Sequence, residues 1–206
     1  MGDTIQAVIF DCDGVMFDTT KANQAYYDHV LAHFGLPDMT PAQFALAHMH
    51  TADMAMTYLF PDEKLRTAAQ EYRRTLTYQP FFKYMEMEPT LKGLLKKLRP
   101  RFKTAVASNR ADTMAAVLST HGLESDFDMV VCALDVVAPK PHPEMLLKVL
   151  DHFEINPRQA LYVGDSILDQ QAAAAAGIPF VAYANPELTS ARHHIDSLAQ
   201  LQAILL

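Results

Sequence analysis

Two aspartates, Asp11 and Asp13, stand one residue apart at the end of a short apolar run, residues 7–10. Such a run is typical of a buried strand, and residues two apart in extended backbone point the same way. Both carboxylates should therefore face one spot just past the end of the strand. Carboxylates held this close repel each other, so one must take a proton or a cation must lie between them. A stable core does not require that arrangement, whereas chemistry does.

These two residues predict phosphoryl transfer. An ionised Asp11 is a competent nucleophile towards phosphorus and would give an aspartyl-phosphate. Asp13 could act as the acid towards the leaving oxygen and as the base towards an incoming water. Peptide N–H groups after Asp11 could cradle a phosphate. Cys12 would contribute its backbone N–H rather than its thiol, and Gly14 would let the backbone come close.

A second acidic segment, residues 164–169, follows another apolar run. Asp165 would meet Asp11 and Asp13 across the end of the sheet, and Asp169, one helical turn further on, would lie on the same side. Four carboxylates around one point require a hard divalent cation, and oxygen-only ligands favour Mg²⁺.

Two further segments offer groups that bind anions. Lys140 lies between two prolines in a stiff loop, where its ammonium could bind phosphate and balance the carboxylates. Its bond to Pro141 is a candidate for the cis form. Ser108 and Asn109 offer donors at a helix N-terminus, which suits anions, and Arg110 either reaches substrate or lies on the surface.

Alternating strands and helices are predicted to position these groups. Short apolar runs predict five strands, at residues 7–10, 104–107, 129–132, 160–163 and 180–183. Helical periodicity lies between them, at residues 90–98, 112–120, 143–153 and 169–176. This alternation implies a parallel sheet with right-handed crossovers, in which ligands bind beyond the carboxyl ends of the strands.

Residues 20–84 break this rhythm. They carry no strand candidate but several helical stretches, at residues 21–34, 41–50, 53–58 and 62–78. We therefore expect a core formed by residues 1–19 and 85–206, with a helical insert at residues 20–84 after the first strand.

Composition narrows the classes of partner. The net charge of −7 argues against nucleic acid, because a phosphate backbone needs a basic face. Two cysteines without a CxxC pair exclude a disulfide scaffold. Residues 1–6 lack a signal-peptide pattern, and no apolar run approaches the roughly 18 residues of a membrane helix. We expect a cytoplasmic protein that is a monomer or weak homodimer and acts on a small phosphorylated metabolite, with no membrane partner.

The four segments together resemble the motifs of the haloacid dehalogenase superfamily of phosphohydrolases. Residues 11–15 resemble its first motif, 108–110 its second, 140–141 its third and 164–169 its fourth, in matching order and spacing. The helical insert is similar to the cap of the phosphoglycolate phosphatase and β-phosphoglucomutase branch. The resemblance spans the chain and implies a Rossmann-like α/β core with a parallel five-stranded sheet and an inserted α-helical cap.

The resemblance also implies roles for individual residues. Asp11 would be the nucleophile and a metal ligand, and Asp13 would be the acid/base and bind Mg²⁺ through its backbone carbonyl. Asp165 would be a direct ligand, and Asp169 would hold a ligand or a metal-bound water. The phosphoryl group would be bound by Ser108, Asn109 and Lys140. Val15, where threonine is commoner, and Met87–Thr90, in place of the usual Pro-Gly, depart from the family pattern without touching the chemistry.

The helical insert contains four histidines that could bind substrate or metal. His48 and His50 lie in the turn that would overhang the site, and either could touch substrate. His29 and His33 have the i, i+4 spacing of a zinc pair, but no third ligand is evident, so an exposed helix face is the better interpretation.

The sequence thus predicts a Mg²⁺-dependent phosphatase that hydrolyses a small phosphomonoester, similar to phosphoglycolate or a sugar phosphate, through an aspartyl-phosphate. Three alternatives stay open. A phosphomutase of the same branch would return the phosphoryl group to a sugar. A metal-free haloacid dehalogenase would lack the second aspartate, so Asp13 counts against it. A non-enzymatic binding protein would not need the complete carboxylate set.

Overall fold

The computed structural model describes residues 4–206. The chain forms two compact units, one built from Met1–Phe17 with Met87–Leu206 and the other from Asp18–Glu86. The expected lack of a signal peptide concerns residues 1–6, of which residues 1–3 lie outside the described part. None of the helices in residues 4–206 combines the length and the apolar character that crossing a membrane requires.

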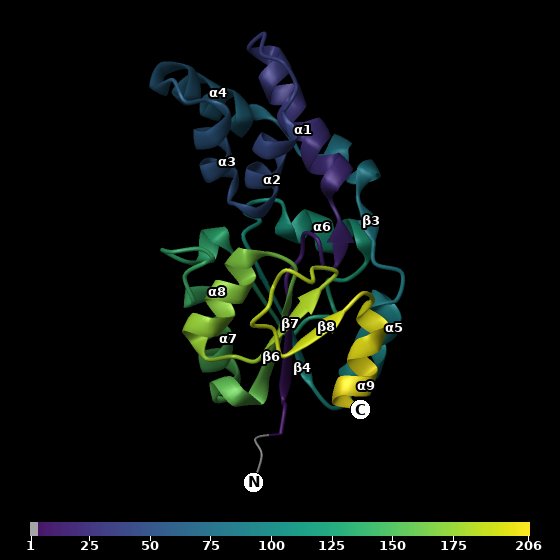
Figure 1. The fold of residues 1–206 in the computed structure, drawn as a ribbon. Helices are drawn as coiled ribbons and strands as arrows, with labels where there is room; N and C mark the ends of the chain where they lie inside the picture. The colour runs from purple at the N-terminus through teal and green to yellow at the C-terminus, as the bar shows by residue number, and fades with distance from the viewer. Residues whose placement is uncertain (1–3) are drawn as a thin grey trace. The chain divides into compact units, whose positions relative to one another are not determined.

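A parallel sheet forms the centre of the first unit (Figure 1). Its strand order is β5-β4-β1-β6-β7-β8. The strands are β1 (Ala7–Phe10), β4 (Lys103–Ser108), β5 (Met129–Cys132), β6 (Ala160–Gly164), β7 (Phe180–Tyr183) and β8 (His193–Ile195). The predicted parallel α/β class is confirmed. The predicted number of strands is wrong, because the sheet has six strands rather than five. The edge strand β8 escaped prediction because it is short and begins with two histidines instead of an apolar run.

Helices cover both faces of this sheet (Figure 1). They are α5 (Leu91–Leu98), α6 (Met114–His121), α7 (Glu144–Phe153), α8 (Ile167–Ala176) and α9 (Leu201–Leu205). Helices α7 and α8 lie on one side, where Ile9, Ala105 and Tyr162 join their apolar residues in one core. The run of alanines in α8 lets this helix pack close to β6 and β7. Helix α5 packs on the other side through four buried leucines.

The strand order places the polar segments at one edge. The chain moves from β1 outward to β4 and β5, and later from β6, on the other side of β1, outward to β7 and β8. The order therefore reverses at β1, and ligands of such sheets bind beyond the carboxyl ends at that point. Phe10, the last residue of β1, pairs with Val106 of β4 and Val163 of β6. The residues that follow these strands consequently emerge side by side.

The second unit is helical. It contains α1 (Thr20–His33), α2 (Pro41–Met49), α3 (Ala52–Leu59), α4 (Glu63–Thr75) and the 3₁₀ helix η1 (Gln79–Tyr84). Side-chain caps begin three of these helices, with Thr40, Thr51 and Asp62 accepting backbone N–H bonds. The strands β2 (Phe17–Asp18) and β3 (Glu86–Met87) pair where the chain passes between the units. Neither strand, nor η1, was predicted, because each is too short to show a hydrophobic period.

Candidate active site

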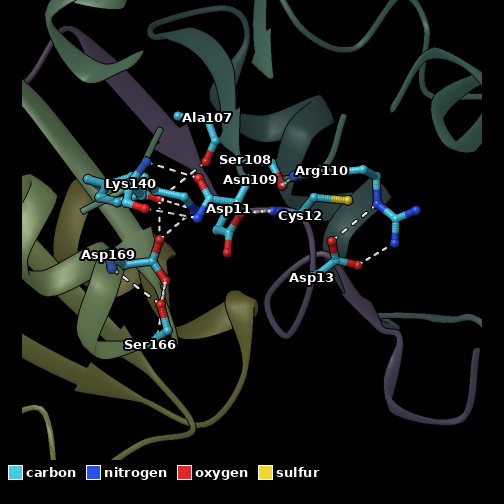
Figure 2. A network of polar contacts seen from close by, with 11 residues as sticks. Asp11, Cys12, Asp13, Ala107, Ser108, Asn109, Arg110, Lys140, Ser166 and Asp169 are labelled. Carbon is cyan, nitrogen blue, oxygen red and sulfur yellow. Dashed lines mark hydrogen bonds and ion pairs between the residues drawn. The ribbon is translucent and has the colours of Figure 1, made fainter. Parts of the chain in front are cut away.

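Residues from four separate segments meet at the carboxyl edge of the sheet (Figure 2). Asp11 follows β1, Ser108 ends β4, Lys140 lies in the loop before α7, and Asp169 lies in the first turn of α8. Each of these four side chains is buried. Buried charged groups are rare in proteins unless they are paired, so the contacts among them indicate what the cluster does.

Asp11 is fixed by its own loop and by Lys140. Its Oδ1 accepts a bond of 2.7 Å from the backbone N–H of Cys12 and lies 2.9 Å from Nζ of Lys140. The backbone N–H of Asp11 donates to the carbonyl of Val163 at 2.9 Å, which ties the residue to β6. The Cys12 N–H predicted to cradle phosphate therefore binds the nucleophile candidate in this structure, and the Cys12 thiol is buried.

The loop that carries Lys140 is clamped by Asn109. The Asn109 side chain donates to the Lys140 carbonyl at 3.1 Å and accepts from the Lys140 N–H at 3.0 Å. An amide side chain matches a peptide group in this way because it carries one acceptor and a donor group. Asn109, predicted to bind phosphate, thus positions Lys140. The predicted cis form of the Lys140–Pro141 bond is confirmed.

Asp169 accepts hydrogen bonds on both carboxylate oxygens. Its Oδ1 accepts from Lys140 Nζ at 2.6 Å and from the Tyr162 hydroxyl at 2.6 Å. Its Oδ2 accepts from the backbone N–H of Ser166 at 3.0 Å and from the Ser166 hydroxyl at 2.5 Å. Ser166 in turn caps α8 by accepting from the Asp169 N–H, so the first turn of the helix fixes this carboxylate.

Burial and crowding set the pKa values in this cluster. Burial raises the pKa of Asp11 to about 7 against the opposing effect of Lys140. Burial, and then the charges of Asp169 and Asp11, also raise the pKa of Asp165. Burial alone would raise the pKa of Asp169, but Lys140 holds it below its usual range. Burial would lower the pKa of Lys140, yet the carboxylates of Asp11 and Asp169 raise it above its usual range. The cluster therefore has more negative charge than one ammonium balances.

The excess charge makes this a fitting site for a divalent cation. One carboxylate oxygen each from Asp11, Asp165 and Asp169 lies within 4.8 Å of the other two. Oxygen-only donors of this kind suit Mg²⁺. Burial, together with the neighbouring carboxylates, raises the pKa of Asp11 and of Asp165, and a cation among the three acids would oppose that effect.

The Asp13 side chain is oriented differently from the prediction. Arg110 holds it in a two-pronged ion pair, with Nη2 at 2.5 Å from Oδ1 and Nε at 3.1 Å from Oδ2 (Figure 2). The Arg110 guanidinium also donates to the Thr113 hydroxyl at 2.9 Å. The expectation of four carboxylates around one point is therefore wrong in this structure. The guanidinium fork matches the two oxygens of Asp13, whose carboxylate is not among the three acids that lie within 4.8 Å of one another.

Asp165 approaches the backbone of Gly14 so closely that a residue with a side chain would clash there. The Gly14 φ of +83° is strained for any residue with a side chain, and a Cβ built there would lie 2.0 Å from Oδ2 of Asp165. We predict that Gly14→Ala displaces Asp165 and lowers the free energy of unfolding by about 2 kcal/mol or more. Urea denaturation and phosphatase assays would measure the two effects.

Gly35 supplies the matched control for that substitution. Its φ is +67°, and a Cβ there meets nothing within 4 Å. Gly35→Ala therefore carries the backbone strain without the clash. Equal losses of stability and unchanged activity in both variants would contradict the close packing of Gly14 against Asp165.

The two histidines of the predicted substrate set lie at the junction of α2 and α3 in the helical unit. The Asn23 amide lies 3.1 Å from Nδ1 of His48 and accepts a bond of 2.5 Å from the Tyr78 hydroxyl. If Asn23 donates, Nδ1 of His48 is the acceptor and Nε2 carries the proton. His50 lies against the Tyr58 ring at 5.4 Å, and burial lowers the pKa of its imidazole.

Three residues that form hydrogen bonds to the candidate site residues were not predicted from the sequence. Ser166 could have been found, because Ser166 and Asp169 have the spacing of a capping box. Asn185, whose amide donates to the Asp165 carbonyl at 2.7 Å, comes from a loop with no local signal. Tyr162 reads as an apolar strand residue, and only its position beside Lys140 shows that its hydroxyl matters.

Comparison with known proteins assigns this arrangement to a family. Residues 8–183 match the haloacid dehalogenase-like hydrolases. A phosphoglycolate phosphatase from Shigella boydii is 30% identical over 210 residues, which cover 87% of this chain and 81% of the relative. Pyrophosphatase PpaX from Bacillus pumilus is 29% identical over 179 residues, which cover 84% of this chain and 81% of the relative. A HAD-superfamily hydrolase of subfamily IA from Geobacter sulfurreducens, known from its crystal structure, is 38% identical and aligns with a TM-score of 0.81 over 100% of this chain and 98% of its own.

Proposed function

The chain belongs to the haloacid dehalogenase-like hydrolases, and from that premise we propose that it hydrolyses a small phosphomonoester through an aspartyl-phosphate on Asp11. The observation that carries the proposal is the placement of Asp11. Its carboxylate lies at the carboxyl end of the central strand, 2.9 Å from the Lys140 ammonium and beside two further acids. The names of two relatives, a phosphoglycolate phosphatase and a pyrophosphatase, support the transfer of a phosphoryl group to water.

The reaction has two steps. A carboxylate oxygen of Asp11 attacks phosphorus, the bond from phosphorus to the leaving oxygen breaks, and Asp13 gives that oxygen a proton. Asp13 then takes a proton from a water that attacks phosphorus and releases phosphate from Asp11. The Ser108 hydroxyl would bind a phosphoryl oxygen, and the positive charge of Lys140, 2.9 Å from Asp11, would stabilise the negative charge on the phosphoryl group in both steps. The backbone N–H groups of Cys12 and Gly14 already bind the Asp11 carboxylate and the Phe17 carbonyl.

Arg110 supports the second step rather than binding substrate directly. Its ion pair with Asp13 holds that carboxylate in the ionised form that accepts a proton from water. Donation in the first step requires that the Asp13 carboxyl group carry a proton. The ion pair with Arg110 would therefore form after Asp13 has given that proton to the leaving oxygen, and before the second step.

Asp11, Asp165 and Asp169, together with the backbone carbonyl of Asp13, would hold Mg²⁺. The ion would reduce the repulsion between the nucleophile and an anionic substrate. Asp169 already accepts four hydrogen bonds within the protein, which favours the resemblance's second option for this residue, a contact to a metal-bound water.

The helical unit Asp18–Glu86 is the proposed cap. It would close over the bound substrate and exclude bulk water from the reacting phosphorus. His48 and His50 would then contact the part of the substrate beyond the phosphate, and the hydrogen bonds of Asn23 and Tyr78 would orient His48.

A screen of phosphorylated metabolites with Mg²⁺ tests this function. We expect release of inorganic phosphate from small phosphomonoesters such as phosphoglycolate or sugar phosphates. Conversion of one sugar phosphate to its isomer without free phosphate would identify a phosphomutase instead. Halide release from 2-haloacids in the presence of a chelator would identify a dehalogenase. No turnover across the whole panel would favour a binding protein and overturn the proposal.

A further inference from the structure

Tyr162 is a buried tyrosine that the proposed reaction does not use. It lies in the middle of β6, where it pairs with Ile9 of β1 and Phe180 of β7, and its side chain is 0% exposed. Its ring lies 6.0 Å from that of Phe180 in the core beneath α7 and α8. A phenylalanine would fill the same apolar space. The hydroxyl therefore requires an explanation, because burying a hydroxyl is costly unless it is hydrogen-bonded.

The hydroxyl has three partners in the site. It lies 2.6 Å from Oδ1 of Asp169 and 3.2 Å from the Ala107 carbonyl, and it accepts a bond of 3.0 Å from Nζ of Lys140. A hydroxyl has one proton to donate, and the shorter contact to a charged acceptor takes it. Tyr162 thus donates to Asp169 while it accepts from Lys140.

With the contact to the Tyr162 hydroxyl, each of the three N–H groups of the Lys140 ammonium has an acceptor. An ammonium has three N–H donors and no acceptor. In this structure the three acceptors are Asp169 at 2.6 Å, Asp11 at 2.9 Å and the Tyr162 hydroxyl at 3.0 Å. The Lys140 ammonium is therefore held in one rotation, between the nucleophile candidate and the first turn of α8.

We propose that Tyr162 is a positioning residue for phosphoryl transfer, whose hydroxyl holds the Lys140 ammonium against Asp11 and Asp169. The inference rests on the proposed function. Without the hydroxyl, one N–H of Lys140 loses its acceptor, and two contacts instead of three then fix the ammonium beside Asp11. Catalysis depends on such placement, because small shifts of a catalytic group cost large factors in rate.

Tyr162→Phe is the direct test, since it removes one oxygen and keeps the ring. We expect kcat to fall about tenfold, as for the loss of a hydrogen bond to a charged group, with KM within about twofold of the wild-type value. Tyr72→Phe is the matched control. It removes a hydroxyl that lies 3.2 Å from His29 in the helical unit, and it should leave kcat unchanged. p-Nitrophenyl phosphate with Mg²⁺ serves as the substrate, and thermal melting reports the stability of each variant.

A double-mutant cycle separates positioning from a merely structural role. In a Lys140→Gln background, measured by single turnover, Tyr162→Phe should change the rate less than about twofold, because the group it acts through is gone. A tenfold loss that persists in that background, or no loss in the single variant, would overturn the role of Tyr162 while leaving the phosphatase assignment in place. Absence of turnover by the wild-type protein on the whole substrate panel would overturn both proposals.

Discussion

Replacing Asp11 with asparagine is expected to abolish turnover while leaving the fold intact. The introduced side chain is nearly the same size, and its amide oxygen can still accept from the Cys12 N–H and from Lys140, the contacts made at 2.7 and 2.9 Å by Asp11. An amide is not a nucleophile towards phosphorus, so no aspartyl-phosphate can form. We expect phosphate release to fall by on the order of 10³-fold or more, as for the loss of other nucleophiles.

Asp128→Asn provides the control for that substitution. Asp128 accepts a 2.8 Å bond from the Thr104 N–H, where β4 begins, at the end of the sheet away from Asp11. The same chemical change there should leave kcat within about twofold of wild type. Circular dichroism and thermal melting would show that both variants fold. Full activity of Asp11→Asn would remove the basis of the proposed reaction.

Removing divalent metal is expected to have an effect of similar size. Asp11, Asp165 and Asp169 gather around one point, and within residues 4–206 Lys140 supplies the one ammonium that contacts this acidic group. Without a cation the nucleophile repels an anionic substrate, so dialysis against a chelator should lower kcat by on the order of 10²-fold or more. Adding Mg²⁺ back should restore the rate, which a titration of released phosphate against Mg²⁺ concentration would follow.

Asp165→Asn distinguishes a metal requirement from an effect of the chelator on the protein. The variant keeps the shape of the side chain but replaces a negatively charged metal ligand with a neutral one. The Mg²⁺ concentration for half-maximal activity should therefore rise about tenfold or more. The far-ultraviolet circular dichroism of the wild-type protein should not change in the chelator. Undiminished turnover in the chelator would instead favour metal-free chemistry.

Strands could be predicted from the sequence where an apolar run coincides with a buried position in the sheet. The runs that form β1, β6 and β7 are buried and largely apolar because helices cover both faces of a parallel sheet. Parallel strands also end at a common edge, so the residues after them could be placed together without a structure. The helical insert was visible because residues 20–84 lack such runs.

The pairing of polar side chains was not predictable in the same way. The Asn109 side chain also clamps the backbone of Lys140, and Arg110 forms an ion pair with Asp13, and neither contact was predicted. Both contacts join segments far apart in the chain, and a residue's type does not reveal which partner it meets. Tyr162 shows the same limit, since its ring follows the strand pattern while its hydroxyl belongs to the site.

Trapping the phosphorylated enzyme is the direct test of Asp11 as the nucleophile. The wild-type protein would be mixed with a substrate from the screen and Mg²⁺, quenched in acid during turnover, and digested for mass spectrometry. We predict a phosphoryl group on the peptide that contains Asp11. It should be labile in base, as an acyl phosphate is, and absent from Asp11→Asn. Steady turnover with a phosphoryl group on another residue, or with none trapped under conditions that retain acyl phosphates, would contradict Asp11 as the nucleophile.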